Sequence, residues 1–138
     1  MLKVKGLKID AMVQGYLAAE LWAGSVIGID DPDIDQTDLN WERESPLLDN
    51  LGYTIENFSV KALIDTVCEC KEFYKVNANL LDGCDLETVG HDFMLTRNGH
   101  GAGFWDGDYQ HGAELTKASK TYGSTNLYVD SNGEISFI

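Results

Sequence analysis

The sequence predicts an α+β domain in which a small, mostly antiparallel four-stranded sheet packs against two longer helices and one short helix. Three observations lead to this fold class. Two stretches carry apolar residues at helical spacing, the last segment alternates apolar and polar residues, and a glycine-rich stretch near residue 100 contains an Asn-Gly pair. The expected order of the elements is ααββαββ, within one domain over residues 1–138.

The first helix is expected at residues 8–23, where apolar side chains recur every three or four positions. The second and longest helix is expected to begin after Ser59, because serine is a good N-cap. Phe58 and Leu63 are spaced as a hydrophobic staple across this start. The apolar face of this helix continues to about residue 81, so the helix is expected to end there.

Residues 90–108, GHDFMLTRNGHGAGFWDGD, combine polar, aromatic and glycine residues within a short stretch. The segments 91–96 and 101–106 each suit a strand, and residues 97–100 suit the turn between them. Asn-Gly is a strong hairpin signal because both residues tolerate positive φ. This stretch is therefore expected to form a β-hairpin.

The C-terminal part of the sequence predicts a short helix and a second hairpin. Leu115, Ala118 and Tyr122 lie at helical spacing, and Gly123 follows as a helix end. The segment TNLYVDSNGEISFI then alternates apolar and polar residues on both sides of the Asp-Ser-Asn-Gly turn at 130–133. Two antiparallel strands are expected here.

The net charge of −13 limits the classes of partner. A direct nucleic-acid binder needs lysine and arginine to displace counterions, and an anionic membrane surface also repels this charge. No apolar run reaches the roughly 18 residues of a membrane span, and the N-terminal residues lack the features of a secretory signal. Cys68, Cys70 and Cys84 lack zinc-site spacing and are expected to be reduced thiols.

The segment 28–57 is acidic and irregular, and it is the candidate partner-binding region. An exposed tryptophan among charges suits an interface, although a cap over the core edge is the alternative for this ring. The candidate residues are Asp31, Asp33, Asp35, Asp38, Trp41, Glu42 and Glu44. The first three aspartates and Glu42 also match calcium-loop positions, but Gln36 stands where the loop turn needs glycine, so no metal site is predicted.

The run GHDFMLTRNGHGAGFWD resembles the motif GHDFWLTRNGHGAGFWD of a family of small acidic proteins from bacteriophages and prophages. Met94 departs from this pattern, since tryptophan is common there. The resemblance extends from about residue 90 to residue 129 and, more loosely, into the two predicted long helices. It implies a phage origin and, with it, the cytoplasm of a bacterial host as the location. It implies no particular activity.

The same motif offers three kinds of chemistry. Its candidate ligand or structural residues are His91, Asp92, Arg97, Asn98, His100, Phe104, Trp105 and Asp106. Arg97, His100 and Trp105 could capture a nucleotide or another small molecule. His91, Asp92 and Asp106 could serve a small hydrolase, although no nucleophile or phosphate-loop motif accompanies them. Arg97 could instead bridge an aspartate of the motif and hold the hairpin together.

Protein binding accounts for more of the sequence than either alternative does. Carboxylates spaced like phosphates would compete for a basic surface, and such binding should weaken with salt. We therefore expect a phage accessory protein that binds and inhibits a host or defence protein without a cofactor. Trp22, a large aromatic near the end of the first helix, is expected in the core.

Overall fold

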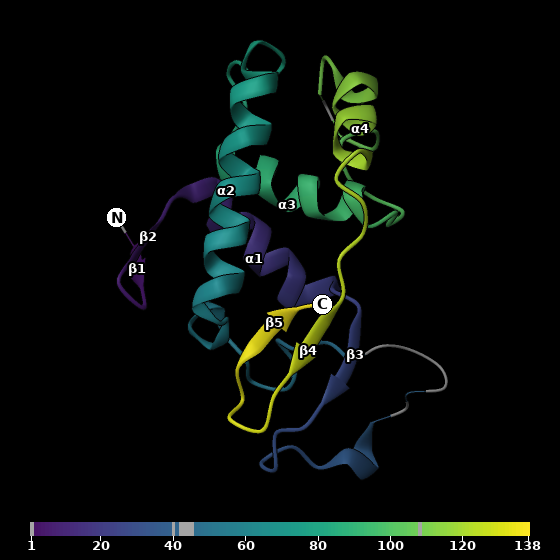
Figure 1. Cartoon of the computed structure of the whole chain (residues 1–138). Helices are drawn as coiled ribbons and strands as arrows, with labels where there is room; N and C mark the ends of the chain where they lie inside the picture. Colours follow the sequence, from purple (N-terminus) through teal and green to yellow (C-terminus); the bar gives the residue numbers. More distant parts are fainter. Residues whose placement is uncertain (1, 40, 42–45, 108) are drawn as a thin grey trace.

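A computed structural model describes residues 2–39, 41, 46–107 and 109–138 of the chain (Figure 1). The fold is α+β, as the sequence predicts. The elements in chain order are β1 (Leu2–Val4), β2 (Leu7–Ile9), α1 (Ala11–Ala23), β3 (Val26–Ile29), the 3₁₀ turns η1 (Gln36–Asp38) and η2 (Ile55–Asn57), α2 (Val60–Asn77), η3 (Ala78–Leu80), α3 (Leu86–Arg97), α4 (Gly112–Lys120), β4 (Leu127–Val129) and β5 (Ile135–Phe137).

The strands form two small sheets, so the prediction of one four-stranded sheet is wrong. β1 and β2 make an antiparallel hairpin, and the second sheet has the order β3-β4-β5. Within it, β4 pairs antiparallel with β5, as predicted, and parallel with β3, which was not predicted. Strands of three or four residues are too short to give a clear alternating pattern, and a parallel partner can lie far away in the sequence.

The two long helices confirm their sequence predictions. Asp10 caps α1 by accepting a hydrogen bond from the Val13 N–H at 2.9 Å, and Ser59 caps α2 by accepting one from Ala62 at 3.1 Å. Phe58, predicted as one half of the staple at the start of α2, is fully buried, as is its partner Leu63. The predicted short helix is present as α4, but it ends at Lys120 with Thr121 as its C-cap, and Gly123 turns the chain with a φ of +74° just beyond it.

The predicted hairpin in the glycine-rich stretch is wrong. The segment 91–96 lies in α3, and the segment 101–106 is a loop that pairs with no strand. Val89, Phe93 and Arg97 are all buried and follow one another at four-residue spacing, which is the period of a helix. This period outweighs the hairpin signal of the Asn-Gly pair.

The Asn98-Gly99 pair ends α3 instead of turning a hairpin. Gly99 adopts a φ of +71°, its N–H donates to the Thr96 carbonyl at 3.1 Å, and the His100 N–H donates to the Leu95 carbonyl at 3.0 Å. These two bonds form a Schellman motif, in which the residue after the cap takes the left-handed conformation. The same tolerance of positive φ therefore serves a helix end here.

α1 and α3 cross with their backbones in contact. A Cβ atom added to Gly90 would lie 1.8 Å from the Met12 carbonyl oxygen, and one added to Gly15 would lie 1.9 Å from the Glu87 carbonyl oxygen. Because real Cβ contacts are never this short, both positions require glycine as long as the helices stay this close. The glycine that begins the motif is therefore a packing residue.

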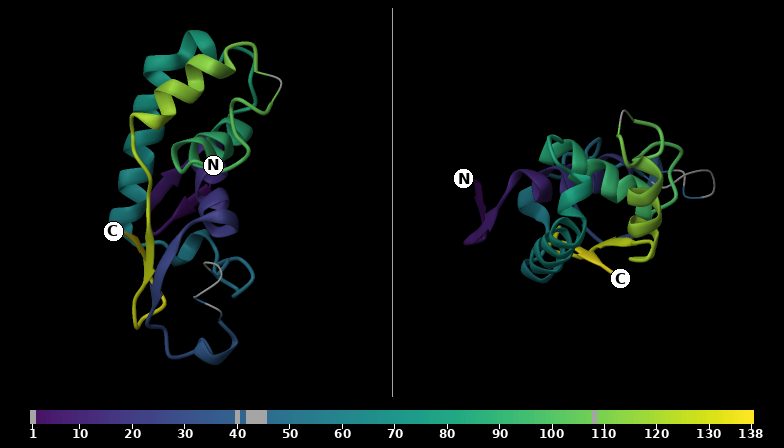
Figure 2. Two further views of the ribbon diagram at one scale, coloured as in Figure 1. Left: turned by 90° about the vertical axis from the view of Figure 1, so that its right-hand side faces the viewer. Right: turned by 90° about the horizontal axis from the view of Figure 1, so that it is seen from above.

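The core lies where the three longer helices meet. The Phe73 ring of α2 stacks on the Phe93 ring of α3 with centroids 4.2 Å apart, and Tyr122 meets the Phe93 ring edge-on at 5.1 Å. α4 lies beside the far end of α2, and the β3-β4-β5 sheet occupies the other half of the elongated molecule (Figures 1 and 2). Among the described residues, no helix is long and apolar enough to cross a membrane.

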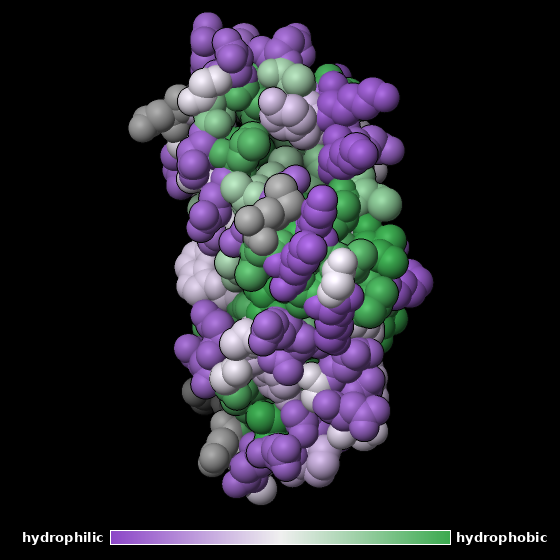
Figure 3. Space-filling view, turned by 90° about the vertical axis from the view of Figure 1, so that its left-hand side faces the viewer, coloured by the Kyte–Doolittle hydropathy of each residue, from purple (hydrophilic) through white to green (hydrophobic). Residues whose placement is uncertain are grey.

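The face that carries the β1-β2 hairpin and α2 has apolar side chains in its middle and hydrophilic ones around them (Figure 3). Leu2, Val60, Ile64 and Tyr74 are exposed hydrophobic residues of these elements. Residues 30–39 of the acidic segment lie beyond the sheet, at the end of the molecule away from α4 (Figures 1 and 2). Tyr53 and Glu56, near the other end of this segment, line a pocket together with Leu2 and Val4 of the β1-β2 hairpin.

Candidate functional site

Arg97 lies inside the protein, where its side chain donates four hydrogen bonds to other parts of the chain. Its Nη1 donates to Oε2 of Glu69 on α2 at 3.0 Å and to the Tyr16 hydroxyl on α1 at 3.3 Å. Its Nε and Nη2 donate to the carbonyl oxygens of Gly123 and Tyr122 at 2.8 and 2.9 Å. Arg97 thus joins α1, α2 and the end of α4. Neither Asp92 nor Asp106, the two aspartates considered for a bridge to Arg97, is among these partners.

Asn98 connects α3 to a buried carboxylate through the segment before β4. Its Oδ1 accepts a hydrogen bond from the Thr125 N–H at 2.7 Å, and the Thr125 hydroxyl donates to Oε2 of Glu20 at 2.8 Å. Glu20 is fully buried, and its Oε1 has no hydrogen-bond partner among the described residues. Burial raises the pKa of Glu20 to about 7, and hydrogen bonds from Thr125 and Tyr16 lower it by less.

Phe104 is a core residue and not a stacking platform for a ligand. Its ring is fully buried, lies parallel to Phe73 at 5.8 Å and meets the Tyr109 ring edge-on at 4.9 Å. Its N–H donates to the Thr96 hydroxyl of α3 at 3.1 Å. The loop after α3 is therefore fixed to the helix by a buried ring and a buried hydrogen bond.

His91 and Asp92 point away from each other, so the predicted hydrolase set is not assembled. The His91 ring lies 5.4 Å from the Trp22 ring of α1. Oδ2 of Asp92 accepts a hydrogen bond from the Tyr109 hydroxyl at 2.7 Å. Burial is the larger cause of a raised pKa of Tyr109, and this hydrogen bond is the second. Asp106 is exposed on the loop. Only the predicted hairpin would have brought these carboxylates and the imidazole together, and α3 takes its place.

The predicted capture set of Arg97, His100 and Trp105 is also separated. His100 is half-buried just after α3, and Trp105 is an exposed ring on the following loop. Arg97 faces the interior, where its guanidinium lies 5.6 Å from the centroids of two aromatic rings. The cation that was expected to bind a phosphate is therefore part of the core.

Two aspartates of the acidic segment are held in fixed positions. Oδ2 of Asp31 accepts a hydrogen bond from the Tyr53 hydroxyl at 2.6 Å, and Oδ1 accepts one from the Asp33 N–H at 3.0 Å. Oδ1 of Asp35 accepts from both the N–H and the hydroxyl of Thr37. The Tyr53 and Thr37 bonds lower the pKa of Asp31 and Asp35, respectively, so both carboxylates stay ionised.

The acidic segment is attached to the sheet at one point and to α1 at another. The Asp30 N–H donates to the Val129 carbonyl at 2.8 Å, and the Tyr128 hydroxyl donates to the Asp30 carboxylate. The Asp49 N–H donates to the Leu21 carbonyl near the end of α1 at 3.0 Å. These contacts place the acids of the segment on a fixed framework.

The other predicted residues of the segment have different outcomes. Trp41 is 40% exposed, which is less than a free ring but too much for a core residue. Asp38 lies in η1, while Glu42 and Glu44 fall outside the described residues. Among the residues that are described, no group of three or more His, Cys, Asp or Glu is arranged to hold a metal ion.

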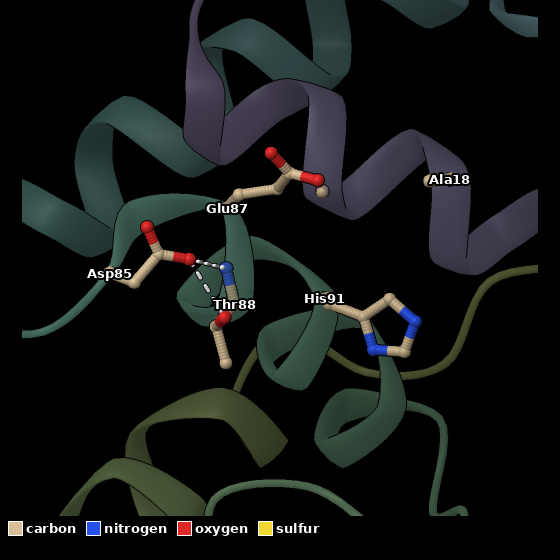
Figure 4. Close-up of a pocket in the computed structure, with 6 residues that line it drawn as sticks. Ala18, Asp85, Glu87, Thr88 and His91 are labelled. Carbon is tan, nitrogen blue, oxygen red and sulfur yellow. Dashed lines mark hydrogen bonds between the residues drawn. The ribbon is translucent and has the colours of Figure 1, made fainter.

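An open crevice of about 380 Å³ lies between α1 and α3, beside the first histidine of the motif (Figure 4). In Figure 4, His91 stands at one end of it and the Asp85–Thr88 pair at the other, while Glu87 extends toward α1. The residues that line it are Gly15, Ala18, Asp85, Glu87, Thr88 and His91.

Two residues near these sites were not identified from the sequence. Trp22, expected in the core, is 50% exposed and covers His91. Its spacing from Gly15 and Ala18, seven and four residues, places it on the face of α1 that borders the crevice. Glu20 follows Tyr16 by four residues, so helical spacing alone would have placed this acid on the buried face.

Comparisons of this chain with protein-family models, with curated proteins and with solved structures found no match.

Proposed function

We propose that the protein is a binding protein whose acidic surface engages a basic region of a partner protein. The observation that carries this proposal is the excess negative charge of the segment 28–57. Its sequence has nine acids against one base, Arg43, and the acids are Asp30, Asp31, Asp33, Asp35, Asp38, Glu42, Glu44, Asp49 and Glu56. A surface of one charge sign attracts partners of the opposite sign.

Fixed carboxylates favour such a role because they need not be ordered on binding. Asp31 and Asp35 accept local hydrogen bonds, and these bonds keep the pKa of both below the ordinary value. Their charges therefore persist throughout the neutral range. Carboxylates held on a framework resemble the phosphates of a nucleic acid, so a nucleic-acid-binding protein is the kind of partner that we propose.

The resemblance to small acidic phage proteins supports a host or defence protein as this partner. Catalysis and nucleotide capture have less support, because both depended on a hairpin that is replaced by a helix. Arg97 and Phe104 are buried, and His91 and Asp92 face different neighbours.

The proposal can be tested with the Asp33→Asn/Asp35→Asn double variant. Immobilised wild-type protein is expected to retain a basic protein from a bacterial lysate at low salt and to lose it at high salt. The variant should retain markedly less, although asparagine can still cap Thr37. Asp82→Asn/Glu114→Gln removes the same charge elsewhere and should retain as much as wild type.

Equal retention by both double variants would show that the acidic segment is not the binding surface. Retention that does not change with salt would contradict an electrostatic mechanism altogether.

A further inference from the structure

The crevice between α1 and α3 is open because its floor has almost no side chains. Gly15 and Ala18 of α1 form this floor, and the Glu87 backbone lies directly against Gly15. The space of about 380 Å³ therefore lies at the crossing of two helices, which fix the residues around it (Figure 4). Such a space is large enough for a single side chain of a partner.

Two of the polar residues that line this crevice are carboxylates, and among the described residues neither has a lysine or arginine partner. Asp85 and Glu87 are exposed, and neither forms an ion pair with any described residue. Asp85 accepts two hydrogen bonds from Thr88, both at Oδ2, and these bonds lower the pKa of Asp85. No lysine or arginine lines the space. The crevice is therefore suited to a cation.

The end of the crevice at His91 is aromatic. The Trp22 and His91 rings lie 5.4 Å apart with 34° between their planes, and half of the Trp22 surface is exposed. An exposed tryptophan face attracts a cation more strongly than the other aromatic side chains do. Two carboxylates and His91 thus line the same small space, and the Trp22 ring packs against His91 at its edge.

We propose that this crevice binds the guanidinium group of an arginine side chain from the partner protein. Arginine fits better than lysine, because its planar group can stack on a ring while donating to a carboxylate such as Glu87. The inference rests on the proposed function and names a side chain that the basic partner contributes. The Leu21–Asp49 hydrogen bond joins the end of α1 that carries Trp22 to the acidic segment, so both can face one partner.

The test uses a short blocked peptide, acetyl-Gly-Arg-Gly-amide, and its citrulline counterpart, which has the same shape without the charge. Titration of ¹⁵N-labelled protein should move the Trp22 indole and α3 amide signals saturably with the arginine peptide only. Glu87→Gln and Trp22→Ala should each weaken binding about two- to fivefold, as expected for one exposed ion pair or one cation–π contact. Glu114→Gln and Trp105→Ala should leave the affinity unchanged.

Equal shifts with the citrulline peptide, or an unchanged affinity in Glu87→Gln, would overturn the arginine site. If Trp22→Ala does not fold, Trp22→Leu replaces it, since leucine keeps apolar volume without an aromatic face. No peptide binding, together with partner retention that still depends on Asp33 and Asp35, would reject this site and leave the proposed function standing. If the peptide binds but retention of the partner does not depend on Asp33 and Asp35, the acidic segment is not the binding surface and the arginine site in the crevice stands.

Discussion

The motif at residues 90–108 and the acidic segment at 28–57 use their polar residues in opposite ways. In the motif, Arg97 and Asn98 bond to other elements of the protein, and the Phe104 ring lies in the core. In the acidic segment, the carboxylates receive local hydrogen bonds but face solvent with their charge intact. A motif rich in polar and aromatic residues can therefore be a structural unit, while a segment with little helix or strand carries the exposed charge.

This comparison predicts that changes in the motif affect stability and that changes in the segment affect binding. Four variants test this difference, one of them at Glu20, which Thr125 links to Asn98 of the motif.

Arg97→Met should lower the free energy of unfolding by about 3–5 kcal/mol. The change leaves the buried Tyr16 hydroxyl and the part-buried carbonyls of Tyr122 and Gly123 without this donor. A buried group left without a partner costs about 1–3 kcal/mol, and removing one partner of a buried ion pair costs about 3–5 kcal/mol. Glu69 is partly exposed and can be rehydrated, so it adds little. Urea unfolding measures the effect. Lys120→Met is the control, because it removes an exposed cation. Similar stability of the two variants would contradict the structural role of Arg97.

Glu20 should make stability fall as the pH rises. Its pKa rises from 4.5 to about 7 on folding, so the folded protein binds this proton more tightly than the unfolded chain does. The contribution of Glu20 is therefore most favourable below pH 4.5, and it is lost as the pH rises to 7. Relative to Glu20→Gln, wild type should lose up to about 3 kcal/mol between pH 5 and pH 8. A constant difference between the two proteins over this range would contradict a raised pKa of the buried Glu20 carboxyl.

Gly90→Ala should lower the free energy of unfolding by about 1–3 kcal/mol, the usual cost of overpacking. Its new methyl group would meet the Met12 carbonyl at 1.8 Å and push α1 and α3 apart. Gly101→Ala is the matched control, because a Cβ there would meet nothing within 4 Å. Thermal unfolding of both variants compares two glycines of one motif, and equal melting temperatures would rule out the close helix crossing.

Asp33→Asn/Asp35→Asn should change the free energy of unfolding by less than about 0.5 kcal/mol, as is usual for exposed surface positions. Chemical unfolding at pH 7 measures this change. A loss comparable to that of Gly90→Ala would mean that the acidic segment also supports the fold, and the contrast between the two regions would disappear.

Helices with caps and a long apolar face could be predicted from the sequence. Ser59, Phe58 and Leu63 mark the start of α2, and all three act as local physical chemistry expects. The terminal hairpin could also be predicted, since Asp130 and Gly133 lie between two segments that alternate apolar and polar residues. These elements are determined by residues that are close together in the chain.

The remaining elements depend on distant residues or on an ambiguous local signal. Asn98-Gly99 tolerates positive φ in a hairpin turn and in a Schellman motif alike, and only packing decides between them. The burial of Arg97 follows from Glu69 and from the end of α4, neither of which is near it in sequence. Of the candidate site, the acidic segment could be predicted, but the crevice beside Trp22 required the crossing of two helices.

The parallel pairing of β3 with β4 has a consequence for synthesis. Val26 pairs with Leu127, so β3 leaves the ribosome roughly 100 residues before its neighbour in the sheet does. Because translation adds about 5–20 residues per second, β3 remains without its partner strand for about 5–20 s. Throughout that interval Val26 and Ile29, both buried in the finished protein, lack the strand that covers them. Nascent chains should therefore expose this edge until the β4-β5 hairpin emerges.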